Sequence, residues 1–283
     1  MSDIPGGPTP PPPPPPPGTP PGAGAIRPRT FGEIFSAAFE IYKDNASKLI
    51  LIVALVVVPL SLIGAVLGEV FAGADEETEV IFGQTQTISD RTFAAVVIGA
   101  LIAAVIAVII SAVLQAATMR GAALATIGDP VDIEASYRYG LKRFGSVILV
   151  ALMVGLVIAV GFILLIVPGI IFLTLLSVSI PALVIENRRG TDAMKRSWDL
   201  ASGNFWHVLG VIIVAALITG FVGSIIGALG GDNWFARWIF TTIAQIVTAP
   251  FSALVSVVLY LDLRARKEAL TADSLRAELA SNA

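Results

Sequence analysis

Residues that could take part in chemistry gather in one polar stretch between two apolar ones, residues 181–207, PALVIENRRGTDAMKRSWDLASGNFWH. Glu186 ends the first apolar stretch, and His207, the only histidine of the chain, begins the second. A carboxylate and an imidazole beside several guanidinium groups are residue types that can move protons or hold an anion. Because an interfacial histidine is more often exposed than a ligand, we interpret His207 as exposed and predict no catalytic residue here.

The rest of the chain offers no alternative active site. It has no cysteine and one histidine among 283 residues, which excludes disulfides, thiol nucleophiles, zinc–cysteine sites and multi-histidine metal sites. The sequence also shows no phosphate-binding glycine loop, paired-carboxylate site or Ser-His-Asp set. We therefore predict no enzymatic activity, no catalytic residue, no cofactor and no metal site.

Composition places the chain in a membrane. Hydrophobic residues make up 55% of it and charged residues only 14%, whereas soluble proteins carry about 25% charged residues. Several apolar runs have the length of about 20 residues that a helix needs to cross a bilayer. The sequence therefore predicts an all-α polytopic membrane protein with six transmembrane helices. We place them at residues 49–68, 92–118, 146–166, 170–185, 208–229 and 239–261.

The predicted spans lack ionisable side chains, because none of them contains Asp, Glu, Lys, Arg or His. Intramembrane ionisable residues mark proton relays and ion pathways, so their absence argues against a coupled transporter. The spans do contain neutral polar residues, which we interpret as interhelical hydrogen-bonding groups rather than a permeation path. These are Gln115, Thr241, Thr242, Gln245, Thr248 and Ser252.

Three interfacial amphipathic helices are predicted, each before a hairpin of two spans, at residues 30–43, 132–144 and 191–204. The third has an apolar face opposite a charged one, so we expect it to lie flat in the headgroup layer. We favour a role as a connector between spans, and a helix that senses or binds anionic lipid is the alternative. We expect Met194, Trp198 and Ala201 to face inward and Lys195, Arg196 and Asp199 to face water.

We interpret the surface helices and hairpins as an internal repeat of three units, two clear and one degraded, and coincidence in an apolar sequence is the alternative. A shift of 159 residues places the first unit on the third, and a shift of 102 places it on the second. The larger shift also superposes two G-x-x-x-G pairs, a pattern that lets membrane helices approach closely. We therefore predict closely packed helices at Gly64, Gly68, Gly223 and Gly227.

The transmembrane domain, residues 29–268, is expected between two cytoplasmic tails. Residues 1–28 are rich in proline and should form a disordered or polyproline tail, because this composition offers no core. We interpret this tail as a solvated tether, and a docking peptide for a proline-binding domain is the alternative. Residues 269–283 should form a polar, helical tail.

Basic residues set the orientation. If both termini are cytoplasmic, the outer loops hold only Arg91 and Arg237 of the 18 basic residues, as the positive-inside rule requires. The acidic loop at residues 75–79 is then outside. We predict a multi-pass protein of a bacterial plasma membrane with both termini in the cytoplasm.

Four segments together resemble one family: AMKRSWDLASGNFW at 193–206, VPGIIFL at 167–173, ALVIEN at 182–187 and YLDLRARKE at 260–268. In order and spacing they resemble the bacterial glycerophosphoryl diester phosphodiesterase membrane domain family, over roughly residues 29–268. Methionine at position 194 replaces the commoner leucine. The family's signature falls on Arg196, Ser197, Trp198, Leu200, Phe205 and Trp206.

In some members of that family the membrane domain precedes a soluble phosphodiesterase barrel, so the resemblance implies a domain label and not an activity. We predict a membrane scaffold or accessory protein that contacts membrane lipid, or a protein partner through the proline-rich tail or the basic inner face, and no nucleic acid. One alternative is a transporter or channel for an uncharged or lipidic substrate, against which the charge-free spans weigh. The other is the membrane subunit of a separately encoded glycerophosphodiester phosphodiesterase, against which the missing catalytic domain weighs.

Overall fold

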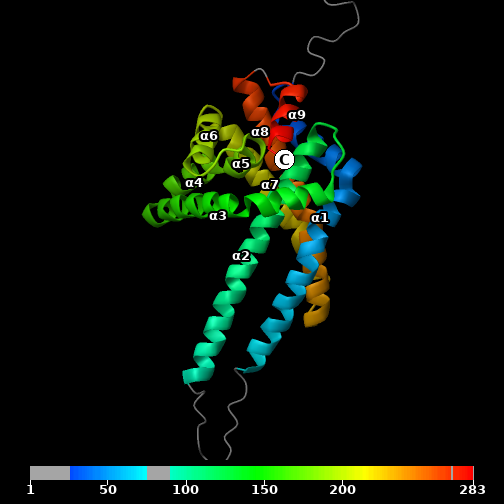
Figure 1. The fold of residues 1–283 in the computed structure, drawn as a ribbon, viewed down its shortest axis with the longest axis vertical. Helices are drawn as coiled ribbons and strands as arrows, with labels where there is room; N and C mark the ends of the chain where they lie inside the picture. Colours follow the sequence, from blue (N-terminus) through cyan, green and yellow to red (C-terminus); the bar gives the residue numbers. More distant parts are fainter. Residues whose placement is uncertain (1–25, 75–89, 269, 283) are drawn as a thin grey trace, which may run out of the picture.

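The computed structural model of the protein describes residues 26–74, 90–268 and 270–282. Within these ranges the long elements are all α-helices, which confirms the predicted all-α fold (Figure 1). Most of the proline-rich tail and the acidic loop at residues 75–79 lie outside the described residues. The helices are α1 (Phe31–Ala74), α2 (Asp90–Thr126), α3 (Ile133–Leu164), α4 (Ile166–Leu176), α5 (Ser179–Glu186), α6 (Thr191–Ser202), α7 (Phe205–Ala228), α8 (Trp234–Lys267) and α9 (Ala272–Ser281).

Six stretches of helix in the described part of the chain are long and apolar enough to cross a membrane. They correspond in order to the six predicted spans, so the chain is a polytopic membrane protein. Their bounds are Phe31–Ala65, Val105–Thr126, Ile133–Leu164, Ile166–Glu186, Phe205–Ala228 and Trp234–Lys267.

Only one of the three predicted surface helices is a helix of its own. α6 is separate, whereas α1 and α3 each run without a break from the predicted surface segment into the following span. No proline or turn sequence divides the two segments in either helix, so continuing the helix keeps the backbone groups hydrogen-bonded. The start of α3 lies where predicted, because the Asp132 carboxylate accepts a hydrogen bond from the N–H of Ala135 at 3.0 Å and so caps the helix.

The turn between α3 and α4 is shorter than predicted. We expected residues 167–169 to form it, but a single extended residue, Leu165, separates the two helices. Pro168 lies instead in the first turn of α4, where its missing N–H costs no helical hydrogen bond. The returning helix then breaks between α4 and α5, just before Pro181, because proline cannot donate to the preceding turn.

The burial pattern supports the internal repeat, because residues that the shifts of 102 and 159 make equivalent have similar size and exposure. In each unit, one such position is fully buried, a second holds a small buried residue, and a third holds a large, apolar, exposed residue. The three units therefore turn the same helix face toward the core, with a small residue at its centre. The three sets of equivalent residues are Ile34, Ser136 and Ala193; Ala38, Gly140 and Ser197; and Phe39, Leu141 and Trp198.

The close packing predicted at the G-x-x-x-G pairs is wrong for Gly64 and Gly223 within one chain. A Cβ atom added at either position would meet no atom within 4 Å. Gly227 has only an ordinary contact at 3.9 Å, and the surroundings of Gly68 lie outside the described side chains. Close approach occurs instead at Gly140 of the repeat, whose added Cβ would lie 2.5 Å from a backbone oxygen of α2.

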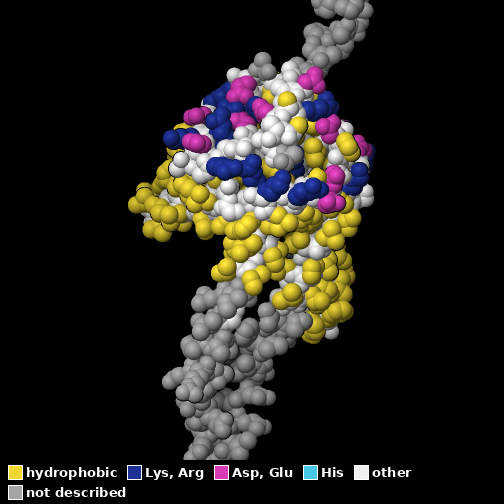
Figure 2. Space-filling model, in the orientation of Figure 1, with side chains coloured by type: hydrophobic (Ala, Val, Ile, Leu, Met, Phe, Trp, Pro, Cys, Tyr) yellow, Lys and Arg dark blue, Asp and Glu magenta, His cyan; other side chains and the backbone are white. Residues whose placement is uncertain are grey.

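The molecule divides into a charged cap and an apolar part. Figure 2 shows Lys, Arg, Asp and Glu gathered near one end, with a largely hydrophobic surface below them. Both described ends of the chain lie in the cap, where the N–H of Ile26 donates to the carbonyl oxygen of Leu270 at 2.9 Å. Leu275 and Leu279 of α9 are buried there, so the predicted C-terminal tail is a docked helix.

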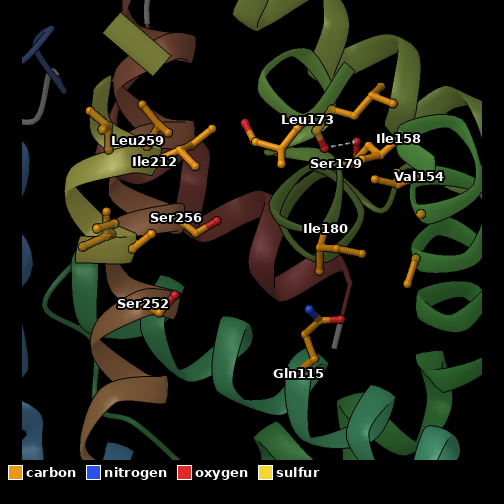
Figure 3. Close-up of a pocket in the computed structure, with 18 of the residues that line it drawn as sticks. Gln115, Val154, Ile158, Leu173, Ser179, Ile180, Ile212, Ser252, Ser256 and Leu259 are labelled. Carbon is orange, nitrogen blue, oxygen red and sulfur yellow. Dashed lines mark hydrogen bonds between the residues drawn. The ribbon is translucent and has the colours of Figure 1, made fainter. Parts of the chain in front are cut away.

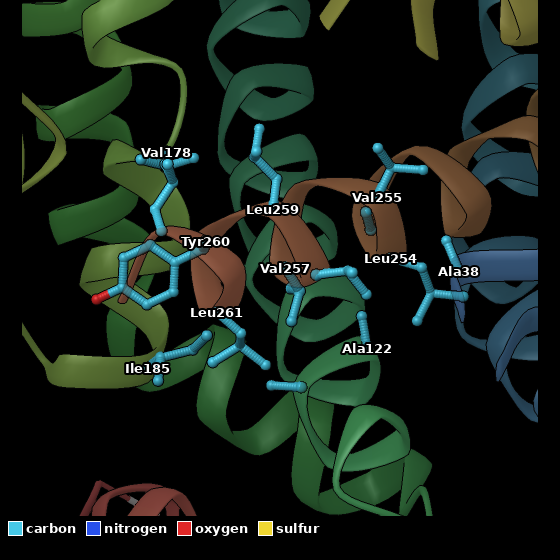
Figure 4. Close-up of a cluster of buried hydrophobic side chains, with 14 of the residues drawn as sticks. Ala38, Ala122, Val178, Ile185, Leu254, Val255, Val257, Leu259, Tyr260 and Leu261 are labelled. Atoms are coloured by element: carbon cyan, nitrogen blue, oxygen red, sulfur yellow. The ribbon is translucent and has the colours of Figure 1, made fainter. Parts of the chain in front are cut away.

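α8 forms the centre of the core. Most side chains of residues 253–264 are buried on every side of this helix, as expected for a helix that other helices cover all round. α1, α2 and α5 supply the neighbouring side chains. Figure 4 shows this cluster, with Leu254, Val257 and Leu261 of α8 near Ala38, Ala122, Val178 and Ile185.

Candidate functional site

A buried carboxylate lies where α5, α6 and α8 meet. Glu186 ends α5, and only 7% of its side chain is exposed. Its Oε1 atom accepts hydrogen bonds from Arg196 Nη2 at 2.7 Å and Nε at 2.9 Å, and from the hydroxyl of Tyr260. Arg264 Nε lies 3.2 Å from the same oxygen. Three of the four segments that carry the family resemblance thus converge on one carboxylate.

Two further carboxylates extend this cluster toward α9. Glu268 contacts Arg196 and lies 3.1 Å from Arg264 Nε, while Glu278 accepts two hydrogen bonds from Arg264 at 2.8 and 2.9 Å. A third guanidinium lies 3.1 Å from Glu186, so three carboxylates meet three guanidinium groups. We name this set the Glu186 network: Glu186, Arg188, Arg196, Tyr260, Arg264, Glu268 and Glu278.

The charges of the Glu186 network hold one another ionised. Partial burial alone would raise the pKa of Glu268, but hydrogen bonds from Arg196 and Arg264 hold that pKa below its ordinary value. Burial likewise opposes the charge of Arg196, yet its bonds to Glu186 and Glu268 raise the pKa of the guanidinium. Groups held in this way stay charged near neutral pH, which makes them poor proton-transfer groups.

The turn between α5 and α6 brings Arg196 beside Glu186, because two of its residues adopt left-handed backbone conformations. Asn187 ends α5 with φ 57°, and Gly190 precedes α6 with φ 52°. Glycine reaches this region without strain and asparagine more readily than most residues. The chain can therefore reverse over residues 187–190.

Residues at the centre of α6 bind the end of α4, the second helix of the α3–α4 hairpin. The Ser197 hydroxyl donates to the carbonyl oxygen of Leu175 at 2.7 Å and accepts from the N–H of Val178 at 3.2 Å. It thereby satisfies backbone groups left free by the break between α4 and α5. Next to it, the Trp198 ring lies 6.3 Å from that of Phe172.

The other signature residues divide between the core and the surface. Leu200 is fully buried, whereas Trp206 is 80% exposed. The rings of Phe205 and Trp206 pack edge to face at the start of α7, with centroids 5.3 Å apart. An exposed tryptophan at the head of an apolar helix suits the membrane–water interface.

The predicted faces of α6 are partly wrong. Lys195 and Asp199 are exposed and Ala201 is buried, as expected, but Arg196 is turned inward and Trp198 is 41% exposed. The paired carboxylates are the reason, since a guanidinium can be buried when it is paired and hydrogen-bonded. The buried face consists of Ala193, Ser197, Leu200 and Ala201, with Met194 half-buried at its edge.

A second buried carboxylate ties the start of α7 and the N-terminal segment to α8. Asp262 is fully buried and accepts from the N–H of Arg29 at 2.5 Å and from Arg266 Nε at 2.8 Å. Arg266 also donates to the carbonyl oxygen of Arg29 at 2.6 Å. His207 Nε2 lies 3.2 Å from Asp262, and the His207 side chain is 19% exposed. The interpretation of His207 as an exposed residue is therefore wrong.

The pairing of the buried Asp262 and of the partly exposed Glu278 with arginines was not found from the sequence. A usable pattern was present for Asp262, because acidic and basic residues four positions apart share one helix face. α8 contains two such pairs, Asp262 with Arg266 and Arg264 with Glu268. The distance of Glu278 from Arg264 in the sequence gave no comparable indication.

A cavity of about 570 Å³ opens between α3–α5 on one side and α7–α8 on the other (Figure 3). Most of its lining is aliphatic. Gln115 of α2 and Ser252 and Ser256 of α8 add polar groups that have no hydrogen-bond partner among the described residues. The described lining carries no charged side chain. A bound molecule could therefore form hydrogen bonds with uncharged amide and hydroxyl groups in an otherwise apolar cavity.

No family model, curated protein or solved structure matches the chain. The resemblance to the phosphodiesterase membrane domain family therefore stays a prediction from its four segments.

Proposed function

We propose that the protein is a membrane accessory protein without catalysis of its own, which binds a lipid in the cavity between α3–α5 and α7–α8. The observation that carries this proposal is the cavity itself, about 570 Å³ in volume and lined by aliphatic side chains with a few uncharged polar groups. Ligand sites in proteins are typically about 300–1,000 Å³ and mostly apolar, with few orienting polar groups.

The lining favours an uncharged polar group attached to hydrocarbon. The amide of Gln115 and the hydroxyls of Ser252 and Ser256 can donate to ester carbonyls and accept from an alcohol. Inside a bilayer such groups need partners, because water is scarce. A charged headgroup would find no opposite charge in the described lining, so we infer a ligand with a glycerol-ester or alcohol region.

The Glu186 network supports a role without catalysis. Its carboxylates and guanidinium groups pair with one another and join α5, α6, α8 and α9. Paired charges of this kind hold the helices against each other, and removing one partner of a buried pair is costly because the other charge is left uncompensated. We therefore assign the charged signature residues to assembly of the cap.

We place the charged cap in the cytoplasm of a bacterial cell, with both chain ends inside the plasma membrane. The asymmetry of basic residues supports this orientation, because Arg237 lies at the far end of α8 while the paired arginines lie in the cap. A basic cap would also attract anionic headgroups, at about 1 kcal/mol per exposed Lys or Arg.

Photocrosslinking tests the lipid site. Purified protein in nanodiscs is exposed to a photoreactive diacylglycerol, and the crosslinked fraction is measured by mass spectrometry. Gln115→Leu removes the amide from the cavity, and Gln245→Leu makes the same change on α8 outside it. Crosslinking should fall several-fold in Gln115→Leu and stay unchanged in Gln245→Leu. Equal crosslinking of both variants and the wild type would contradict a site at Gln115.

Two measurements separate the proposal from its alternatives. Flux of an uncharged solute or a labelled lipid well above that of empty vesicles would favour a transporter or channel. Copurification of a soluble hydrolase with glycerophosphodiesterase activity would favour the membrane subunit of an enzyme. The accessory role expects lipid binding without flux.

A further inference from the structure

The tip of the α3–α4 hairpin is apolar and uncovered. Six consecutive residues, Phe162 to Val167, are between 43% and 83% exposed. They include no polar side chain, and neither do the next residues, Pro168 and Gly169. A turn that emerges from a membrane into water normally carries polar residues, so this tip lacks the features of an emerging turn.

The turn between α7 and α8 supplies the contrast within the same chain. It contains Asp232 and Asn233, and the Asn233 side chain caps α8 by accepting from two backbone N–H groups. Trp234 and Arg237 lie in the first turn of α8 and are exposed. These residue types belong at a membrane–water interface.

The hairpin also points in a different direction from the other apolar helices. Figure 1 shows α1 and α2 descending from the cap, whereas α3 and α4 project to the side across that direction. Figure 2 shows the corresponding apolar arm directly below the charged residues of the cap. α6 packs on α4, and its exposed Lys195 and Asp199 belong to the polar side. One side of the arm thus carries a polar helix, while its tip is apolar.

Backbone hydrogen bonds within the arm close its turn. At its turn the N–H of Leu165 donates to the carbonyl oxygen of Gly161 at 3.0 Å, and the N–H of Gly169 donates to that of Leu165 at 3.3 Å. A Cβ at Gly161 would lie 3.0 Å from the Gly169 Cα, so only glycine lets the two helices meet there. Internal pairing of backbone groups is what a lipid-exposed turn requires.

We propose that the α3–α4 hairpin is a re-entrant wedge, which enters and leaves the membrane on the side of the charged cap. Its partner is the acyl chains of that leaflet. Two of the six stretches that are long enough to cross the bilayer then do not cross it. α1, α2, α7 and α8 remain as crossings, and both chain ends stay on one side. This inference does not depend on what the cavity binds.

Single cysteines test the wedge, because the native chain has none. Asp232→Cys marks the far turn and Lys195→Cys marks the cap, and each should react with an impermeant maleimide from its own side only. Leu165→Cys should react from neither side of oriented vesicles, and should react after the membrane is dissolved in detergent. Labelling of Leu165→Cys from the Asp232 side would overturn the wedge.

Depth in the correct leaflet is tested with a nitroxide on the same Leu165→Cys protein. A nickel-chelating lipid is added to one leaflet of oriented vesicles, and relaxation of the nitroxide is measured. Lipid added on the Lys195 side should enhance relaxation several-fold more than lipid added on the Asp232 side. The opposite order would mean that the hairpin crosses the bilayer, and would overturn the proposal.

Introducing a charged residue at the tip of the hairpin is an independent test of the wedge. Leu165 and Leu229 are 69% and 65% exposed, and Leu229 directly precedes the polar turn between α7 and α8. Leu165→Lys should reduce the amount of inserted protein several-fold, while Leu229→Lys should leave it near the wild-type amount. Equal amounts of the two variants would show that both turns reach an interface, against the wedge.

Discussion

The hydroxyl of Ser197 on α6 donates a hydrogen bond to the carbonyl oxygen of Leu175 at 2.7 Å, across the break between α4 and α5. The hydroxyl oxygen of Ser197 in turn accepts from the N–H of Val178 at 3.2 Å. One fully buried side chain thus serves both ends of an interrupted helix. It also occupies the small-residue position of the repeat, where a larger side chain would push α6 away from the hairpin.

Ser197→Ala should destabilise the protein by about 1–3 kcal/mol, because a buried backbone N–H and a buried carbonyl oxygen lose their partner. Ser202, on the same helix, is exposed and bonds only to a nearby carbonyl oxygen. Ser202→Ala should change stability by less than about 0.5 kcal/mol. Thermal unfolding in nanodiscs measures both. A Ser197→Ala protein as stable as Ser202→Ala would show that water replaces the hydroxyl.

Arg264→Met should cost about 3–5 kcal/mol, since it removes a partner from the buried carboxylate of Glu186 and from the partly exposed carboxylate of Glu278. The matched control is Arg138→Met, which removes an exposed pair with Glu134 at 2.9 Å. Exposed pairs of this kind contribute about 0–1 kcal/mol. Equal losses in the two variants would mean that solvent screens the network as fully as it screens the surface pair.

Acid should loosen the attachment of α6 to α8 through Glu268. Its pKa in the folded protein is held below the ordinary value by Arg196 and Arg264, despite partial burial. A lowered pKa means that the folded state favours the ionised carboxylate. The stabilisation is therefore complete above the ordinary pKa of about 4.3 and is lost as the pH falls through the lower, folded-state pKa.

Unfolding temperatures recorded from about pH 7 to about pH 3 test this linkage. Glu268→Gln removes the titrating group and should flatten the acid end of the profile while lowering stability at neutral pH. A Glu268→Gln profile parallel to that of the wild type would assign the acid dependence to other carboxylates.

The number and order of the long apolar helices followed from apolar length, whereas the continuity of α1 and α3 with the preceding surface segments did not. The shared burial of Ala38, Gly140 and Ser197 agrees with the predicted repeat at the expected shifts. The sequence-based prediction of exposure failed where a residue distant in the sequence pairs with a charged side chain and allows it to be buried. Arg196 belongs on a water-facing side by its own chemistry, and only the carboxylate of Glu186 makes its burial favourable.

The segments that form the Glu186 network could be predicted from the sequence, but the contacts between them could not. The sequence singles out the segments around Arg196 and Arg264, but the contact of both with Glu186 depends on the reversal at residues 187–190. The direction of the α3–α4 hairpin was likewise out of reach, because apolar length says how far a helix extends and not where it points.

The last prediction compares two glycines of α3: Gly140, which occupies the small-residue position of the repeat, and Gly145, which does not. A Cβ at Gly140 would lie 2.5 Å from the backbone oxygen of Val113, which cannot move without shifting α2. A Cβ at Gly145 would meet nothing within 4 Å. Gly140→Ala should therefore destabilise the protein by about 1–3 kcal/mol through overpacking.

Gly145→Ala is the matched control, because it makes the same chemical change in the same helix. Alanine is a better helix former than glycine by about 1 kcal/mol, so this variant should unfold at the same or a higher temperature than the wild type. Thermal unfolding in nanodiscs compares the two. If Gly140→Ala gained stability as Gly145→Ala does, an added Cβ at Gly140 could not lie 2.5 Å from the Val113 oxygen. α2 and α3 would then have to be farther apart where they cross.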